Sequence, residues 1–165
     1  MSEIQTDITV VRTTYSNVAG HFDTQAKKYD QGCEKVQWRG PQAVSDAALK
    51  YIREPVEVVL DVGTGTGKLG KLLKDAHPKA VVFGVDPSKN MVAETQKKGE
   101  LSGVAVANAT NLPVKTGTVN IAAASGVFDF IEKSEVPALV AEFQRVLRPG
   151  GIVAFNFEPE GTEHD

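Results

Sequence analysis

The 165-residue sequence predicts an α/β protein with a doubly wound, mostly parallel sheet of about five strands and helices on both faces. Short apolar runs alternate with segments whose apolar residues recur at helical spacing. A glycine-rich turn also joins the first strongly apolar run to a helical pattern, as in parallel sheets that bind nucleotides. The length suits one domain with a hydrophobic core.

Two helical patterns precede the sheet. The first spans residues 18–30 and has one apolar face. The second begins near Pro41, which suits the first turn of a helix, and ends before Pro55.

Strands and helices then alternate as far as residue 157. Ser88 is expected to cap one helix, which Gly99 ends, and Ser134 is expected to cap the last helix, which Gly150 breaks. The expected strands are residues 56–62, 80–86, 103–107, 118–124 and 152–157, with helices over 67–76, 88–98 and from 134.

The glycine turn is the most informative stretch of the chain. Residues 58–67 read V-V-L-D-V-G-T-G-T-G, a buried strand followed by three alternating glycines. Glycine permits positive φ and removes the side chain from the path of a ligand. Because a helix follows at once, its free N–H groups face the turn. The stretch therefore predicts a cradle for part of a nucleotide-like cofactor.

Two known nucleotide-binding patterns can be compared with this turn. Residues 65–70, G-T-G-K-L-G, satisfy the dinucleotide pattern G-x-G-x-x-G. Asp61, however, would repel a pyrophosphate and suits a ligand that carries positive charge. The phosphate-loop pattern fails, because Leu69 replaces the required hydroxyl and Val62 the first glycine.

Four motifs in order resemble those of the class I S-adenosylmethionine-dependent methyltransferases, of the type 11-like, small-molecule kind. They are residues 61–67 (DVGTGTG), 86–91 (DPSKNM), 108–113 (NATNLP) and 143–151 (FQRVLRPGG). The resemblance covers about residues 58–157 and implies a Rossmann-like fold, S-adenosyl-L-methionine as cofactor and a small-molecule acceptor. It divides the chain into a polar arm with a lid-like helical segment (residues 1–45), the cofactor-binding domain (46–157) and an acidic tail (158–165).

The resemblance also implies roles for single residues. Asp61 would accept from the amino group of the donor, or would instead cap nearby backbone N–H groups. Asp86 lies about 20 residues past the glycines, where a carboxylate grips ribose hydroxyls, although Asp-Pro-Ser is also an ordinary helix entry. The remaining candidates for cofactor binding are Gly63, Gly65, Gly67, Pro87, Asn108, Ala109, Ser125 and Arg39.

Several positions depart from the family pattern or have two interpretations. Asn108 stands where the family commonly has aspartate, yet its amide can still accept from adenine. Asn120 is expected to be a buried asparagine bonded to backbone. Residues 128–130 form a Phe-Asp-Phe loop that would wall an acceptor pocket, or else supply phenylalanines to the core. Asp129 in this loop is the one candidate catalytic residue and would orient or deprotonate a nucleophile, or else be a solvated acid. Trp38 would lie on the cofactor, beside Arg39, or be a packing aromatic.

Charge and composition argue against several classes of protein. The net charge is −3 with no basic block, so nucleic acid is not a favoured partner. No apolar run approaches the ~20 residues that span a bilayer, and the three histidines have no metal-ligand spacing. The single cysteine, Cys33, favours a cytoplasmic location.

Three functions remain open on the sequence. The first is a methyltransferase that acts by SN2 transfer, the second a catalytically impaired donor-binding or scaffold protein, and the third an NAD-dependent oxidoreductase. Family members normally continue into two more strands, whereas a polar, acidic segment follows Phe157. Strand five is therefore expected to be an exposed edge, which a homodimer could cover.

Overall fold

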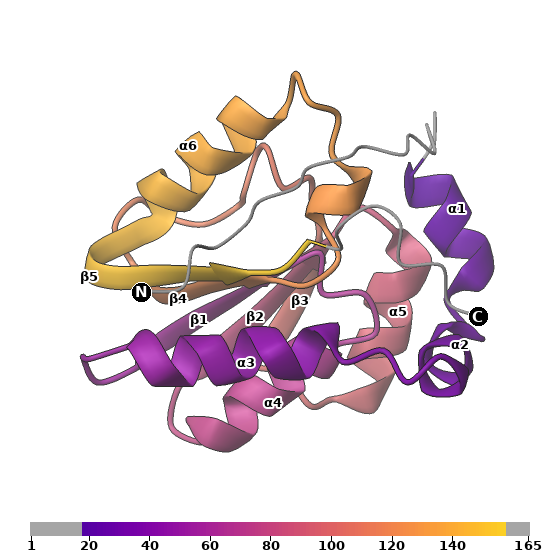
Figure 1. Cartoon of the computed structure of the whole chain (residues 1–165), viewed down its shortest axis with the longest axis horizontal. Coiled ribbons are helices and arrows are strands. Elements are labelled where there is room, and N and C mark those ends of the chain that lie inside the picture. The colour runs from indigo at the N-terminus through magenta and orange to yellow at the C-terminus, as the bar shows by residue number, and fades with distance from the viewer. Residues whose placement is uncertain (1–17, 158–165) are drawn as a thin grey trace, which may run out of the picture.

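The computed structural model describes residues 18–157, which form a five-stranded sheet flanked by helices (Figure 1). The strand order is β3-β2-β1-β4-β5, and all four pairings are parallel. The predicted doubly wound fold is thus confirmed. The strands are β1 (Val58–Val62), β2 (Val81–Asp86), β3 (Gly103–Val106), β4 (Val119–Ala124) and β5 (Leu147–Phe155).

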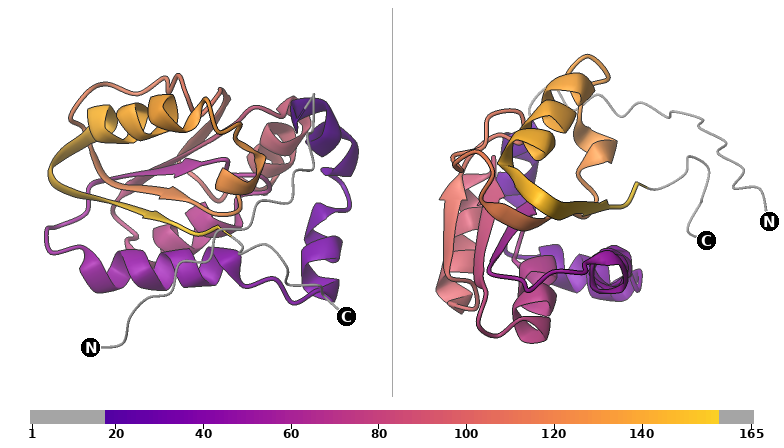
Figure 2. Two further views of the ribbon diagram at one scale, coloured as in Figure 1. Left: turned by 45° about the horizontal axis from the view of Figure 1, so that its top comes forward. Right: turned by 90° about the vertical axis from the view of Figure 1, so that its left-hand side faces the viewer.

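Helices cover both faces of the sheet (Figure 2). One face carries α3 (Gly40–Tyr51) and α4 (Lys68–Ala76), and the other carries α6 (Val136–Val146). Helix α5 (Lys89–Lys98) lies along β2 and β3. Two short helices, α1 (Val18–Gln25) and α2 (Tyr29–Lys35), and the 3-10 helix η1 (Phe128–Phe130) lie at the ends of the strands (Figure 1).

The core follows from the alternation of side chains along the strands. In β1, Val59 packs with Leu73 of α4 on one face, while Leu60 packs with Leu139 and Phe143 of α6 on the other. The central strands are apolar on both sides because both of their faces are covered.

Most predicted helix ends are confirmed. Ser88 caps α5 by accepting a hydrogen bond from the Met91 N–H at 3.1 Å, and Gly99 ends it in the left-handed conformation. The predicted Ser134 cap is wrong, since α6 starts at Val136 with Glu135 at the N-cap position.

The predicted bounds of one helix and one strand are also wrong. The single helix over residues 18–30 is two helices, because α1 is fastened to α5 and α2 to the glycine turn. Strand five begins at Leu147, before the two glycines that were expected to break the helix. A Cβ at Gly151 would lie 2.9 Å from the Val119 oxygen of β4, so glycine there allows the strands to pair closely.

Asn120 has the structural role that was expected. The side chain is fully buried in β4. Its Oδ1 accepts from the N–H groups of Glu57 and Val58, both at 3.0 Å, and its Nδ2 donates to the Pro55 oxygen at 3.2 Å. The amide thereby satisfies backbone groups at the entry to β1.

Candidate functional site

A cavity of about 340 Å³ lies beyond the carboxyl ends of the strands. This size is within the range of small-molecule sites. Its floor combines residues from the ends of four strands: Gly63 and Gly65 after β1, Asp86 on β2, Asn108 after β3 and Ser125 after β4. Candidate residues from four different strands therefore line one cavity, whereas Asp61 does not line it. Pro87 and Ala109 also line the cavity.

Asp86 is held rigidly at the floor of the cavity. One carboxylate oxygen accepts from the Gly65 N–H at 2.9 Å, and the other accepts from the Ser88 N–H at 2.9 Å. The side chain is buried, and burial raises its pKa above the usual value against the effect of these two hydrogen bonds. The residue thus joins the glycine turn to the start of α5 and presents a carboxylate to the cavity.

Asp61 points into the start of α4. Its Oδ2 accepts from the Thr64 hydroxyl at 2.7 Å and from the Gly70 N–H at 2.8 Å. The residue is 1 % exposed, and burial raises its pKa to about 7 although both hydrogen bonds oppose the shift. A carboxylate therefore occupies the helix end at which a dinucleotide would place its pyrophosphate.

The glycine turn requires glycine at the two positions that line the cavity. Both have positive φ, 66° at Gly63 and 54° at Gly65. A Cβ at Gly63 would lie 2.3 Å from the Val127 side chain. At Gly65 the nearest atom to a Cβ would be a Tyr29 carbon at 4.0 Å, so a side chain there would fill the cavity. Gly67 begins α4 with a φ of 87° and packs against Thr95, outside the lining.

Ser125 lies where the main cavity meets a smaller one, of about 30 Å³. Tyr29, Trp38 and Asp61 also line the smaller cavity. The Ser125 hydroxyl is buried, and no group of the described residues hydrogen-bonds to it. A buried hydroxyl without a partner is costly, so this atom is suited to a ligand group.

The outer wall of the cavity is formed by α1, α2 and η1. The Phe22 ring of α1 packs edge-on against Phe130 of η1 with centroids 5.0 Å apart, and against Tyr29 of α2 at 6.0 Å. Val18, Ala19, Ile131 and Glu135 complete this wall. A lid-like segment was expected from the sequence, and so was a wall formed by the Phe-Asp-Phe loop that contains Phe130. Val18, Ala19, Ile131 and Glu135 were not selected as site residues. The apolar face of the first helical pattern was the signal that pointed to Phe22.

Polar contacts fasten the two N-terminal helices. Asp23 of α1 accepts from the Ser88 hydroxyl at 2.6 Å and from the Asn90 N–H at 3.0 Å. Asp30 of α2 accepts from the Thr66 hydroxyl and from Lys98 of α5 at 2.8 Å. The wall is therefore tied to the glycine turn and to α5, the same elements that carry the floor.

The loop that carries Asn108 is also braced. Glu142 of α6 accepts from the Leu112 N–H at 2.7 Å. Arg145 bonds to Glu142 and donates to the backbone oxygens of Leu112 and Val114. The Arg145 guanidinium is the main reason that the pKa of Glu142 is lowered to about 2.

Two predicted site residues lie away from the cavity. Arg39 is exposed at the start of α3, and Asp129 is exposed on η1; neither lines the cavity. Trp38 lines the smaller cavity instead.

The charges of the lining bear on the cofactor. Among the described lining residues, the ionisable acids are Asp86 and Glu135, and no lysine, arginine or histidine is present. Such a cavity favours a ligand with positive charge, as a sulfonium and an ammonium provide, and gives a pyrophosphate no cation. Within residues 18–157 no group of His, Cys, Asp or Glu side chains is arranged to hold a metal ion.

Comparison with known proteins decides the family. Residues 59–151, more than half of the chain, match the model of a methyltransferase domain. The chain belongs to this methyltransferase family. Family membership implies S-adenosyl-L-methionine as the cofactor and removes the basis for the nicotinamide hypothesis.

Relatives of this methyltransferase domain act on different acceptors, by their names. This chain is 31 % identical over 150 residues to a demethylmenaquinone methyltransferase of Thermus thermophilus, and the match covers 88 % of this chain and 64 % of the relative. It is 33 % identical over 155 residues to a malonyl-[acyl-carrier protein] O-methyltransferase of Geobacter sulfurreducens, covering 92 % and 54 %.

A solved structure shares the fold of this methyltransferase domain. The TehB-like SAM-dependent methyltransferase of Corynebacterium glutamicum superposes with a TM-score of 0.66 at 17 % identity, over 81 % of this chain and 73 % of that one. In sequence comparisons the domain spans 46 % to 64 % of the length of several curated relatives. No helix among the described residues is long and apolar enough to cross a membrane.

Proposed function

We propose that this methyltransferase domain binds S-adenosyl-L-methionine in the 340 Å³ cavity and transfers its methyl group to a small-molecule acceptor. The observation that carries the proposal is the lining itself, which combines a fixed acid at the end of β2, Asp86, with glycines that leave the floor bare. When bound, the donor supplies a methyl group that is already activated for in-line displacement. The protein then has to align the reactants and exclude water.

The donor has a matching set of groups on the floor. Asp86 is proposed to accept hydrogen bonds from the ribose hydroxyls, and Asn108 with Ala109 to contact the adenine. Ser125, with its buried hydroxyl, is proposed to meet the amino-acid end near Asp61. Arg39 and Asp129, exposed and outside the lining, have less support as ligands.

Calorimetry and a transfer assay test this function. We expect saturable one-to-one binding of S-adenosyl-L-methionine and none of NAD, followed by transfer of labelled methyl groups to a component of a metabolite extract. Binding of NAD alone would contradict the donor assignment. Donor binding without any transfer would favour the donor-binding or scaffold hypothesis, which the partial coverage of the relatives keeps open.

A homodimer through the β5 edge is a further part of the proposal. Among the described strands β5 pairs with β4 alone. Phe155 and Phe157 at its end are 46 % and 50 % exposed, and Phe155 stacks on Phe128 at 4.4 Å. An unpaired strand with exposed aromatics favours association. Sedimentation at increasing concentration should show a dimer that Phe157→Lys weakens, whereas a strict monomer would exclude this pairing.

The cytoplasmic location stays a prediction from the single cysteine.

A further inference from the structure

The acids of the cavity are not equivalent. Asp86 is buried, and two backbone hydrogen bonds hold its carboxylate in place on the floor of the cavity. Glu135 lies on the outer wall and is exposed. It precedes α6, yet its side chain makes no capping hydrogen bond to that helix. Capping therefore does not account for a carboxylate at this place.

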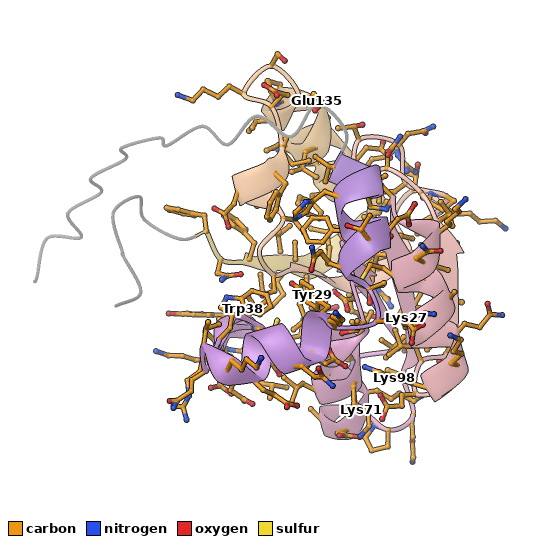
Figure 3. All side chains as sticks on the ribbon, turned by 90° about the vertical axis from the view of Figure 1, so that its right-hand side faces the viewer. Lys27, Tyr29, Trp38, Lys71, Lys98 and Glu135 are labelled. Carbon is orange, nitrogen blue, oxygen red and sulfur yellow. The ribbon has the colours of Figure 1, made fainter. Side chains whose placement is uncertain are left out.

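Apolar and aromatic side chains line the same cavity as Glu135. Phe130 and Ile131 come just before it in the chain, and Val18 and Phe22 of α1 face the same cavity. Figure 3 shows Glu135 at the upper end of this side of the molecule and Tyr29 nearer its middle, with α1 alongside. A carboxylate beside aromatic rings is a combination that binds ammonium groups, through charge pairing and cation–π attraction.

The same surroundings act against anions. A ligand carboxylate or phosphate would lose water on entry and would meet two acids, with no cation among the described lining residues to replace the lost hydration. A neutral ligand would avoid this cost but would gain no charge pairing with Glu135.

We propose that the outer wall of the cavity is the acceptor subsite, and that it selects an acceptor with an apolar body and an ammonium group, which Glu135 binds. This inference rests on the proposed function, because it assigns the floor to the donor. In this proposal Glu135 determines which acceptors bind. The proposal does not assign the atom that receives the methyl group.

Three probes that differ only in their head group test the selection. They are 2-phenylethylamine, 2-phenylethanol and phenylacetate, titrated by calorimetry into the protein saturated with S-adenosylhomocysteine. We expect the amine to bind about 10-fold more tightly than phenylacetate, with the alcohol between them. Glu135→Gln should reduce the preference for the amine roughly 5- to 10-fold, and Glu135→Lys should reverse it.

Glu132→Gln is the matched control. It removes a glutamate three residues earlier that is exposed and does not line the cavity, so the preference should stay as in the unmodified protein. If S-adenosylhomocysteine does not bind, the proposed function itself fails. If it binds but phenylacetate binds as well as the amine, or none of the probes binds, or Glu132→Gln has the same effect as Glu135→Gln, the acceptor assignment alone is overturned.

Discussion

Replacing Asp86 by alanine should weaken binding of S-adenosyl-L-methionine by ~1–3 kcal/mol, or roughly 5- to 150-fold in the dissociation constant. The carboxylate is buried at the end of β2, and its oxygens are positioned by the Gly65 and Ser88 N–H groups. A hydroxyl pair of the ligand would gain charge-assisted hydrogen bonds from this preorganised group. Calorimetry on both proteins measures the difference.

The loss of a ligand contact must be separated from a disturbance of the turn, because Asp86 also braces the backbone of Gly65. The 2′-deoxy analogue of S-adenosylhomocysteine makes this separation. It should bind the unmodified protein more weakly than S-adenosylhomocysteine does, while Asp86→Ala should bind the two compounds about equally. If the variant still discriminates as strongly as the unmodified protein, Asp86 does not hold the ribose.

The second large effect is expected from the pH dependence of folding. Burial raises the pKa of Asp61 to about 7 in the folded protein, whereas in the unfolded chain it lies near its ordinary value of 3.8. The contribution of this group to stability is therefore fully present below pH 3.8 and is lost as the pH rises through 7. From about pH 5 to pH 8, its ionisation should lower the free energy of unfolding by about 2–3 kcal/mol.

Asp61→Asn isolates this contribution. The amide oxygen can still accept from Thr64 and Gly70, but the side chain does not ionise. Urea unfolding without ligand, at pH 5 and pH 8, should show a variant whose stability falls less with pH than that of the unmodified protein. Asp75→Asn, an exposed acid of α4 paired with Lys71, should keep the full decrease. Equal slopes for Asp61→Asn and the unmodified protein would show that Asp61 ionises normally in the fold.

The fold was predictable because its signals are local. Strand and helix periods, the Ser88 cap and the Gly99 stop each depend on a few neighbouring residues, and the structure confirms them. The errors arose where tertiary contacts decide. One helix over residues 18–30 was expected, but Asp23 holds the first half to the start of α5, while Asp30 holds the second half to Thr66 of the glycine turn. Strand five begins early because β4 accommodates the glycines at close range.

The floor of the site was predictable for a topological reason. Residues at the carboxyl ends of parallel strands meet at one edge of the sheet, so Asp86, Asn108 and Ser125 could be grouped from the sequence alone. The wall was not predictable in this way. Glu135 lies at the cavity because η1, just before it in the chain, packs against α1, an arrangement that no periodicity encodes. Arg39, by contrast, lies outside the lining although it neighbours Trp38 in sequence.

The packing of Phe22 against Phe130 links an early and a late part of the chain, and this matters during synthesis. As the protein leaves the ribosome, β1, β2 and β3 with Asp61 and Asp86 are made well before η1. A nascent chain that stops short of residue 128 has most of the floor together with α1 and α2, but it lacks η1, against which Phe22 packs. The wall of the cavity is therefore begun by the first helices of the domain and completed only when η1 has been made.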